Sequence, residues 1–234
     1  MKASDLVTVP FQAGAAVRHR RLFHPVGVLA EGTLERLSPP GEGLPVESGP
    51  IMGRVSKGIG TPGALPDFAG LAWRMQPAPF AATPWDVLLI SAGLGSARAT
   101  VNRLLLRPVV SWAEAVYSSL MPLRHHGELW WVRARLVTEP EGGGLSLTTI
   151  RDGISDGGLA FEVEQACGTG EFIPLARLEL NRAVAGEPVS DGEGRDIAFD
   201  PVRHTAPDVT LWPDWLRELR ELAYRGSRQG RDAH

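Results

Sequence analysis

The strongest constraint on the fold is a series of short apolar runs that turn-forming residues interrupt. The chain has 234 residues, of which 27 are glycine and 19 are proline. So many chain-breaking residues favour short strands joined by turns over a bundle of long helices. Eight runs have the pattern of strands, at residues 22–36, 50–56, 67–75, 85–91, 129–137, 145–150, 159–164 and 173–180.

Glycines inside the first run predict an irregular strand. Residues 22–36 alternate only loosely and carry Gly27 and Gly32. Glycine within a strand indicates a bulge, a bend or a close approach of another backbone. We therefore expect this strand to bend.

Two segments change to the period of a helix. Between residues 96 and 121 apolar side chains recur at helical spacing and Pro108 interrupts them, which predicts two helices or one broken helix. At residues 211–228, Pro213 suits a first helical turn and Asp214 complements the helix dipole. The apolar positions are Leu104, Leu105, Val109, Trp112, Val116 and Leu120 in the first segment and Trp215, Leu216, Leu219, Leu222 and Ala223 in the second.

These elements together predict an α+β fold that is mainly β. Four strands, a helical excursion and four more strands indicate an eight-stranded antiparallel barrel or a sandwich. Closure into a barrel would remove the exposed strand edges. We expect a single domain over residues 1–234, with a barrel at about 20–182, a polar linker at about 183–209 and a C-terminal helix at about 211–228.

Composition narrows the class of protein. The formal net charge is −3 and the pI is near 6.1, so nothing suggests a nucleic-acid-binding surface. The single cysteine, Cys167, excludes an intrachain disulfide and suits a reducing cytoplasm. No apolar run approaches the length of a membrane span, and the first residues lack the apolar core of a signal peptide. We expect a cytoplasmic protein.

Two groups of polar residues near the first strands have spacings that suggest a site. Arg21, His24 and Gly27 form the pattern Arg-x-x-His-x-x-Gly. Arg54 and Ser56 are two residues apart on a predicted strand. Because side chains alternate along a strand, Arg54 and Ser56 should project from the same face.

A third pair lies on the predicted C-terminal helix. Arg220 and Tyr224 are four residues apart, so they should stack on one face of that helix. A phenol with a pKa near 10 must lose its proton to bind a metal at neutral pH. A ferric ion and an adjacent guanidinium would both favour the phenolate. From the residues alone, the pair also fits an amphipathic helix with a tyrosine at its boundary, and the role of metal ligand is implied by the family resemblance given next.

Taken in order, these motifs resemble those of the haem catalase superfamily, in particular its short catalase-related members. Two further matches lie between them, Asp67-x-x-Gly70-x-Ala72 and the pair Trp85-Asp86. In that family the aspartate of the first match lies on the peroxide channel. The resemblance implies an antiparallel barrel that binds haem b, with Tyr224 ligating the iron, Arg220 donating to its phenolate oxygen, and Arg21, Arg54 and Arg231 contacting the propionates.

The resemblance also implies the roles of two distal residues. His24 matches the distal histidine, and Ser56 matches the serine that hydrogen-bonds to it. His24 would act first as a general base and then as a general acid on a peroxide. Catalytic residues are therefore expected at His24 and Ser56.

Departures from the family favour peroxidase over catalase chemistry. Catalases carry an Asn-Asn pair shortly after Trp-Asp, and the first asparagine helps to bind peroxide. Here these positions are Ile90 and Ser91. The chain is also much shorter than a full catalase, and we could not place the phenylalanine that covers the haem. We expect a peroxidase-like oxidoreductase that acts on hydrogen peroxide or organic hydroperoxides.

Two other functions remain open. One is a non-catalytic protein that binds haem or another small ligand on the same barrel. The other is a hydrolase such as a phosphodiesterase, which has less support because there is no P-loop and His125-His126 lacks metal spacing. His125-His126 is better explained as a turn before a strand, and Cys167 as a small buried residue.

The expected partners follow from these functions. They are a peroxide substrate, a small-molecule reductant and a second copy of the chain in a homodimer, without nucleic acid or a membrane.

Overall fold

The structure is a computed structural model that describes residues 26–77, 83–93, 103, 105–138, 140–184 and 197–213. Most of the described residues lie in antiparallel strands, and one helix, α3, lies among them. The strands are β1 Val26–Arg36, β2 Gly49–Lys57, β3 Ala69–Met75, β4 Trp85–Ser91, β5 Val116–Ser118, β6 Leu123–His125, β7 Glu128–Leu136, β8 Leu159–Cys167, β9 Ile173–Ala183 and β10 Val209–Leu211, and α3 is Leu147–Ser155.

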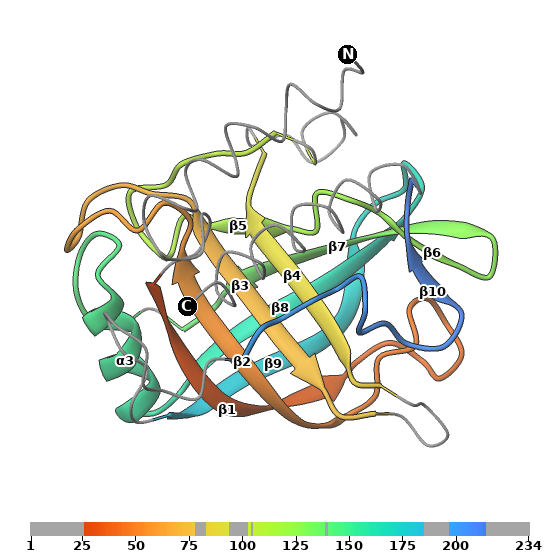
Figure 1. The fold of residues 1–234 in the computed structure, drawn as a ribbon, viewed down its shortest axis with the longest axis horizontal. Helices are drawn as coiled ribbons and strands as arrows, with labels where there is room; N and C mark the ends of the chain where they lie inside the picture. Colours follow the sequence, from red (N-terminus) through yellow and green to blue (C-terminus); the bar gives the residue numbers. More distant parts are fainter. Residues whose placement is uncertain are drawn as a thin grey trace, which may run out of the picture.

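Eight strands close into an antiparallel barrel (Figure 1). The order of the sheet runs from β7 through β5, β4, β3, β2, β1 and β9 to β8, and β8 pairs with β7 to complete the circle. β6 and β10 extend the sheet beyond one end of β7. The predicted barrel is thus confirmed, and the sandwich is wrong.

The barrel interior is filled by apolar rows that cross β1 to β4. Val28, Val55, Leu71 and Leu89 are aligned across these four strands, and each is at most 3% exposed. Burying a side chain of this size contributes about 1.5–3 kcal/mol. Such rows make the barrel a packed core with no channel through it.

Glycine in the next row makes room for a large neighbour. Gly53 is aligned with Ala30 on β1 and with Trp73 on β3. A Cβ atom at Gly53 would lie 2.4 Å from Cδ2 of Leu180 on β9. Small and large residues therefore alternate so that the two sides of the barrel interlock.

The predicted irregularity of the first strand is present. The pairing of β1 with β9 shifts register between Glu31 and Gly32. A Cβ atom at Gly32 would lie 1.9 Å from the carbonyl oxygen of Glu179, which no side chain could tolerate. Gly32 is needed because the backbone of β9 approaches it closely.

The prediction of a strand at residues 145–150 is wrong, because these residues lead into α3. The hydroxyl of Ser146 accepts a hydrogen bond from the backbone N–H of Thr148 and caps the helix. Ile150 and Ile154, one helical turn apart, are both fully buried. The apparent alternation at Leu145 and Leu147 concealed the cap between them.

The helix predicted at residues 96–121 does not extend over residues 105–121. In the described part of that segment Arg103 is helical, whereas Val116–Ser118 form β5, which pairs with β4 and β7, and Val109 forms a bridge to Asp67. Residues 94–102 and 104 lie outside the described part. Some apolar side chains of residues 105–121 are exposed, such as Leu106, and others are buried, such as Trp112, whose indole N–H donates to the carbonyl of Ser146.

The prediction that the C-terminal helix begins at residue 211 is wrong at that residue. Leu211 belongs to β10, which pairs with β6. The rest of that prediction, from residue 214 onwards, lies outside the described residues. The predicted linker at 183–209 is in part an ordered segment, because residues 197–208 pack against the barrel.

No helix in the described part of the chain is both long and apolar enough to cross a membrane.

Candidate functional site

Two of the predicted site residues, Arg54 and Ser56, lie in the described part of the chain. Arg21, His24, Arg220, Tyr224 and Arg231 lie outside it. Their assignments therefore stay predictions.

Arg54 and Ser56 share the outer face of the barrel. Val55, between them, points into the core, so its two neighbours point outward. Arg54 is aligned with Leu29 on β1 and with Ala72 on β3. The prediction that Arg54 and Ser56 project from one face is confirmed.

These outward-facing residues are nevertheless buried. Arg54 is 6% exposed, Ser56 is 5% exposed and Leu29 is 1% exposed. A Cβ atom at Gly27 would lie 2.7 Å from Nε of Arg54. Because Gly27 has no side chain, the guanidinium of Arg54 can lie beside the first residues of β1.

Gly27 and Ala72 lie beside this arginine. The outward-facing residues of β1 to β4 in two neighbouring rows form a surface that we call the outer shelf. The row of Ser56 contains Gly27, Gly70 and Ile90, and the row of Arg54 contains Leu29, Ala72 and Leu88. The shelf therefore combines glycine, alanine, leucine and isoleucine residues with one guanidinium and one hydroxyl.

Ile90 and Ser91 have different surroundings. Ile90 lies on the outer shelf, so an apolar side chain stands there. Ser91 points inward and is fully buried, where its hydroxyl donates to the carbonyl of Arg107 at 2.6 Å and accepts from the backbone N–H of Ala69. Neither residue brings a polar group to the shelf.

Asp67 organises a loop. Its carboxylate accepts hydrogen bonds from the backbone N–H groups of Ile59, Gly60, Thr61 and Phe68, and it is 2% exposed. Burial raises the pKa of this carboxyl, but the hydrogen bonds outweigh burial and leave the pKa below its ordinary value of 3.8. The carboxylate holds the connection between β2 and β3 in place.

Next to the shelf lies a polar cluster that sequence reasoning missed. Asp86 on β4 is fully buried and forms two hydrogen bonds of 2.7 Å with Arg74 on β3. The same carboxylate accepts from the backbone N–H of Asp200 at 2.7 Å and lies 2.8 Å from Nδ1 of His204. The hydrogen bonds with Asp86 raise the pKa of Arg74.

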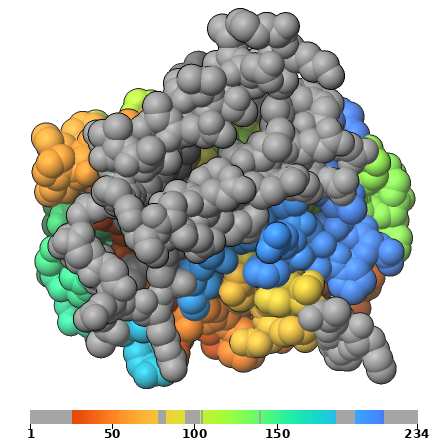
Figure 2. Space-filling model, viewed as in Figure 1, coloured from red at the N-terminus to blue at the C-terminus, as the bar shows by residue number. Residues whose placement is uncertain are grey.

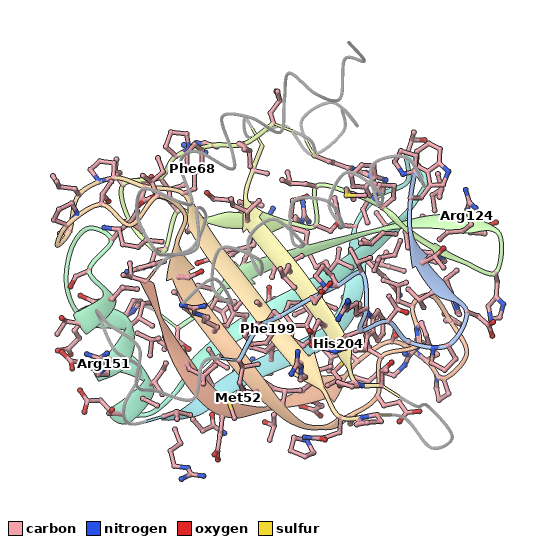
Figure 3. The ribbon with its side chains drawn as sticks, in the orientation of Figure 1. Met52, Phe68, Arg124, Arg151, Phe199 and His204 are labelled. Atoms are coloured by element: carbon pink, nitrogen blue, oxygen red, sulfur yellow. The ribbon has the colours of Figure 1, made fainter. Side chains whose placement is uncertain are left out.

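The cluster fixes residues 197–208 on the outside of the barrel. The guanidinium of Arg74 lies over the ring of Phe199, with its carbon 5.6 Å from the ring centre. His204 and Phe199 lie near Met52, which is in the same outward row as Arg74 (Figure 3). In the space-filling view this blue segment lies beside the yellow residues of β4 (Figure 2).

Part of this cluster had a signal in the sequence. Trp85-Asp86 was noticed as a match, and Arg74 faces Asp86 directly across the β3–β4 pair. His204 is 118 residues away from Asp86, so its contact depends on the complete fold.

The chain contains two tyrosines, Tyr117 and Tyr224, of which the structure describes the first. Tyr117 is fully buried inside the barrel, between β4 and β7. Burial raises the pKa of its phenol well above the usual range, and its hydroxyl has no hydrogen-bond partner among the described residues. Tyr117 is therefore excluded as a metal ligand at the shelf, and the assignment of Tyr224 stays a prediction.

Cys167 is half-buried and not fully buried as predicted. Its thiol donates to the carboxylate of Glu128, and this contact, with burial, raises the pKa of the thiol to about 11. The thiol is therefore a poor nucleophile. His125 and His126 stand at the turn between β6 and β7, as predicted.

The described residues contain no group of three or more histidine, cysteine, aspartate and glutamate side chains that could hold a metal ion. No protein-family model and no curated protein matches the sequence.

Solved structures do match the arrangement of strands. A bacterial catalase matches with a TM-score of 0.59 and 16% sequence identity, over 98% of this chain and 61% of that one. A fungal catalase matches with a TM-score of 0.64 and 12% identity, over 99% of this chain and 63% of that one. The chain has a catalase-like fold. At these identities the similarity concerns the fold alone, and the chain spans about three fifths of the length of either catalase.

Within the catalase-like fold, the outer shelf is the part that carries Arg54 and Ser56. Both come from β2, and β1 and β3 supply the small residues beside them. The shelf therefore places one guanidinium and one hydroxyl, both buried, beside small and apolar residues.

Proposed function

We propose that this protein is a haem-dependent peroxidase that acts on hydrogen peroxide or organic hydroperoxides and oxidises a small-molecule reductant. The observation that carries the proposal is the buried guanidinium of Arg54, which lies over Gly27 on the outer shelf of a catalase-like fold. A buried cation on an apolar surface suits a ligand that is flat, apolar and anionic at one edge.

The described residues fit the distal face of a haem b. A haem is a flat apolar ring with two propionate carboxylates at one edge. Gly70 and Ala72 leave the shelf low enough for a ring to approach, and Arg54 can bind a carboxylate with two parallel hydrogen bonds. Ser56 adds a hydroxyl in the neighbouring row.

The remaining ligands of the proposed cofactor come from residues outside the described part. Arg21 and Arg231 would share the propionates with Arg54. Tyr224 would ligate the iron, and Arg220 would keep its phenol ionised. The interior position of Tyr117 supports the choice of Tyr224, since the sequence has no third tyrosine.

The chain's own contribution to the chemistry would be proton transfer. A bound haem would supply a ferric iron centre that can give two electrons to a peroxide and regain them from the small-molecule reductant. The imidazole of His24 would take the proton from one peroxide oxygen and return it to the other as the O–O bond breaks. The hydroxyl of Ser56 would hold that imidazole in the orientation that this transfer needs.

The apolar side chain of Ile90 supports a peroxidase over a catalase. A catalase must hold a second peroxide molecule close to the iron, and a distal amide helps to do so. Ile90 offers no hydrogen bond there, and the hydroxyl of Ser91 is occupied inside the barrel.

The test compares two reactions of one haem-loaded sample, oxygen evolution from hydrogen peroxide and oxidation of a phenolic dye. We expect dye oxidation to dominate. His24→Ala should lower dye oxidation by about 100-fold or more at equal haem content, whereas His234→Ala should not. Oxygen evolution at the rate of a true catalase would refute the peroxidase, and haem binding without either reaction would indicate a binding protein.

A further inference from the structure

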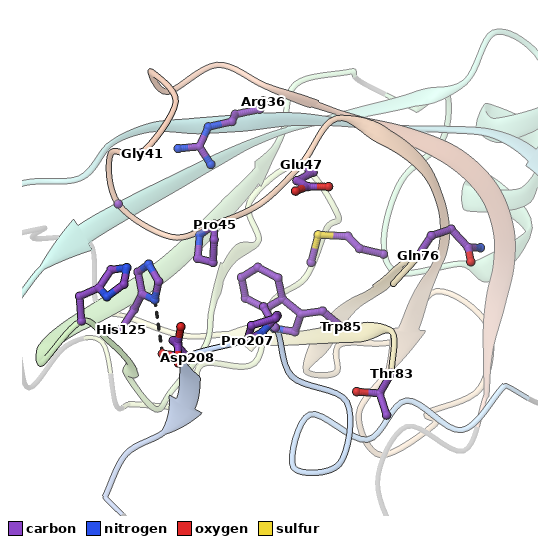
Figure 4. A pocket seen from close by; sticks show the side chains of 14 residues that line it. Arg36, Gly41, Pro45, Glu47, Gln76, Thr83, Trp85, His125, Pro207 and Asp208 are labelled. Atoms are coloured by element: carbon purple, nitrogen blue, oxygen red, sulfur yellow. Dashed lines mark hydrogen bonds between the residues drawn. The ribbon is translucent and has the colours of Figure 1, made fainter. Parts of the chain in front are cut away.

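A second candidate site lies at one end of the barrel. A cavity of about 340 Å³ opens there between the loop that follows β1, the β3–β4 end and the segment that leads into β10 (Figure 4). The residues that decide its chemistry are Pro45, Glu47, Met75, Trp85, Pro207 and Asp208.

The cavity is separate from the outer shelf. Met75, in its wall, is aligned with Ile51, which is three residues before Arg54 on β2, or roughly 10 Å along the strand. Met75 and Trp85 face into the barrel, whereas Arg54 and Ser56 face outward. The cavity and the outer shelf are therefore on different sides of the barrel wall.

Apolar groups form the walls of the cavity. Met75 and Trp85 face each other across the β3–β4 pair, and both are buried. Pro45, in the loop that follows β1, and Pro207, in the segment before β10, complete the apolar lining (Figure 4). A thioether, an indole and two proline rings suit an apolar or aromatic ligand body.

The polar lining of the cavity includes two carboxylates. Glu47 and Asp208 are exposed, and neither carboxylate has a hydrogen bond or an ion pair with another described residue. His125, which is 7% exposed, has its Nδ1 atom 3.3 Å from the carbonyl oxygen of Asp208. The other polar lining residues are Arg36, Gln76, Thr83 and His126.

Arg36, the arginine among the described residues at the rim, already uses its donors within the protein. The guanidinium of Arg36 already donates to backbone carbonyl oxygens of the loop that follows β1, at distances of 2.7–3.0 Å. An anionic ligand would have to displace these hydrogen bonds. The acceptors are those of Ser38, Pro39, Glu42, Leu44 and Val46.

Backbone strain is concentrated at the same place. Among the described residues, three other than glycine have positive φ, and two of them, His126 at 49° and Asp208 at 58°, line the cavity. Such conformations cost free energy and gather at ligand sites. The two loops are thus held in the shape that brings the carboxylate of Asp208 to the cavity.

We propose that this cavity binds a small organic cation, an ammonium group attached to an aromatic or aliphatic body. The ammonium group would pair with the carboxylate of Asp208, and the body would pack against Trp85 and the prolines, with Glu47 on the other side of the cavity adding to its negative charge (Figure 4). The volume is at the lower end of the range for small-molecule sites, which suits an arylalkylamine. This inference does not depend on haem binding or on the proposed peroxidase activity.

The first experiment varies the charge of the ligand on an unchanged protein. Isothermal titration calorimetry, with EDTA present to exclude metal ions, compares 2-phenylethylamine, 2-phenylethanol and 3-phenylpropionate. We expect the amine to bind at least about tenfold more tightly than the alcohol, and the acid not to bind measurably. Equal affinity for amine and alcohol, a preference for the acid, or no binding of the amine would each overturn the proposal.

The second experiment locates the charge on the protein. Glu47→Gln with Asp208→Asn should weaken amine binding by at least about tenfold, and asparagine tolerates the positive φ of Asp208. Glu42→Gln removes the same charge from the same loop without touching the cavity and should leave binding unchanged. Unfolding curves check that each variant is folded. If the double variant bound the amine as tightly as Glu42→Gln, the assignment would be wrong, and if it failed to fold, the ligand series above would decide.

Discussion

At the scale of single residues, Arg54 is the feature that distinguishes this barrel from an ordinary one. A charged side chain on the outside of a barrel is normally solvated, yet Arg54 is 6% exposed. It lies over Gly27, where any side chain would come within 2.7 Å of its Nε atom. We propose a propionate there because Arg54 lies on the outer shelf and matches a propionate arginine of the catalases in the sequence.

Substitution of Arg54 tests this assignment. Loss of a charge-assisted hydrogen bond costs about 1.5–3 kcal/mol, so Arg54→Ala should weaken haem binding roughly tenfold to a hundredfold. Arg54→Lys should recover part of the affinity, because it keeps the charge but loses the two parallel hydrogen bonds. The measurement is a titration with haem followed by absorbance.

Arg151→Ala provides the matched control, since Arg151 is an exposed arginine on α3, away from the shelf (Figure 3). It should bind haem as the parent does. Equal haem affinity for Arg54→Ala and Arg151→Ala would show that Arg54 does not contact the cofactor.

The residue scale also marks what sequence could predict about the site. That Arg54 and Ser56 share a face follows from the two-residue period of a strand. That Arg54 is buried depends on the alignment of β1 with β2, which places Gly27 beside Ser56. No spacing within β2 contains that information.

At the scale of elements, the loop between β2 and β3 depends on Asp67. Four backbone N–H groups donate to this carboxylate, and together they hold its pKa below the ordinary 3.8 although burial acts in the opposite direction. Because the folded-state pKa is lowered, the resulting stability is fully present above the unfolded pKa. It is lost as pH falls through the folded pKa.

Comparison of the parent with Asp67→Asn should display this dependence. An amide has one acceptor oxygen where the carboxylate has two, so we expect the variant to be less stable by about 1–3 kcal/mol at neutral pH. The difference should stay constant above about pH 5 and shrink below pH 4. Denaturant unfolding from pH 3 to pH 7 measures it.

Asp152→Asn, at an exposed position of α3, should show no such pH-dependent difference. A constant difference between the parent and Asp67→Asn down to pH 3 would mean that the carboxylate is not what stabilises the loop.

Elements differed in how well the sequence predicted them. The bend of β1 could be predicted because Gly32 stands inside an otherwise regular run. α3 was missed because its cap, Ser146, lies between two leucines that imitate a strand. β5 was missed because Val116 fits the helical period of its neighbours by chance, whereas the strand depends on pairing with β4 and β7.

At the scale of the whole molecule, the sequence pattern predicted the barrel better than it predicted the bounds of individual elements. Closure into a barrel was expected because it removes the strand edges, and the β7–β8 pairing achieves it. The attachment of residues 197–208 by Asp86 and His204 was not predictable, since it joins residues 118 apart. The two catalases have this fold at 12% and 16% sequence identity to the chain, so few identical residues accompany the shared arrangement of strands.

The central claim is that a haem binds this barrel with Tyr224 as ligand to its iron. The most direct test is the absorbance spectrum of haem-reconstituted parent, Tyr224→Phe and Tyr117→Phe, each checked for folding. The two variants remove the same hydroxyl from the two tyrosines of the chain. The parent and Tyr117→Phe should show the same Soret band, and Tyr117→Phe should be as stable as the parent or more so, because it loses a buried hydroxyl without a hydrogen-bond partner. Tyr224→Phe should remain folded and lose most of its haem. An unchanged spectrum and haem content in Tyr224→Phe would contradict the account.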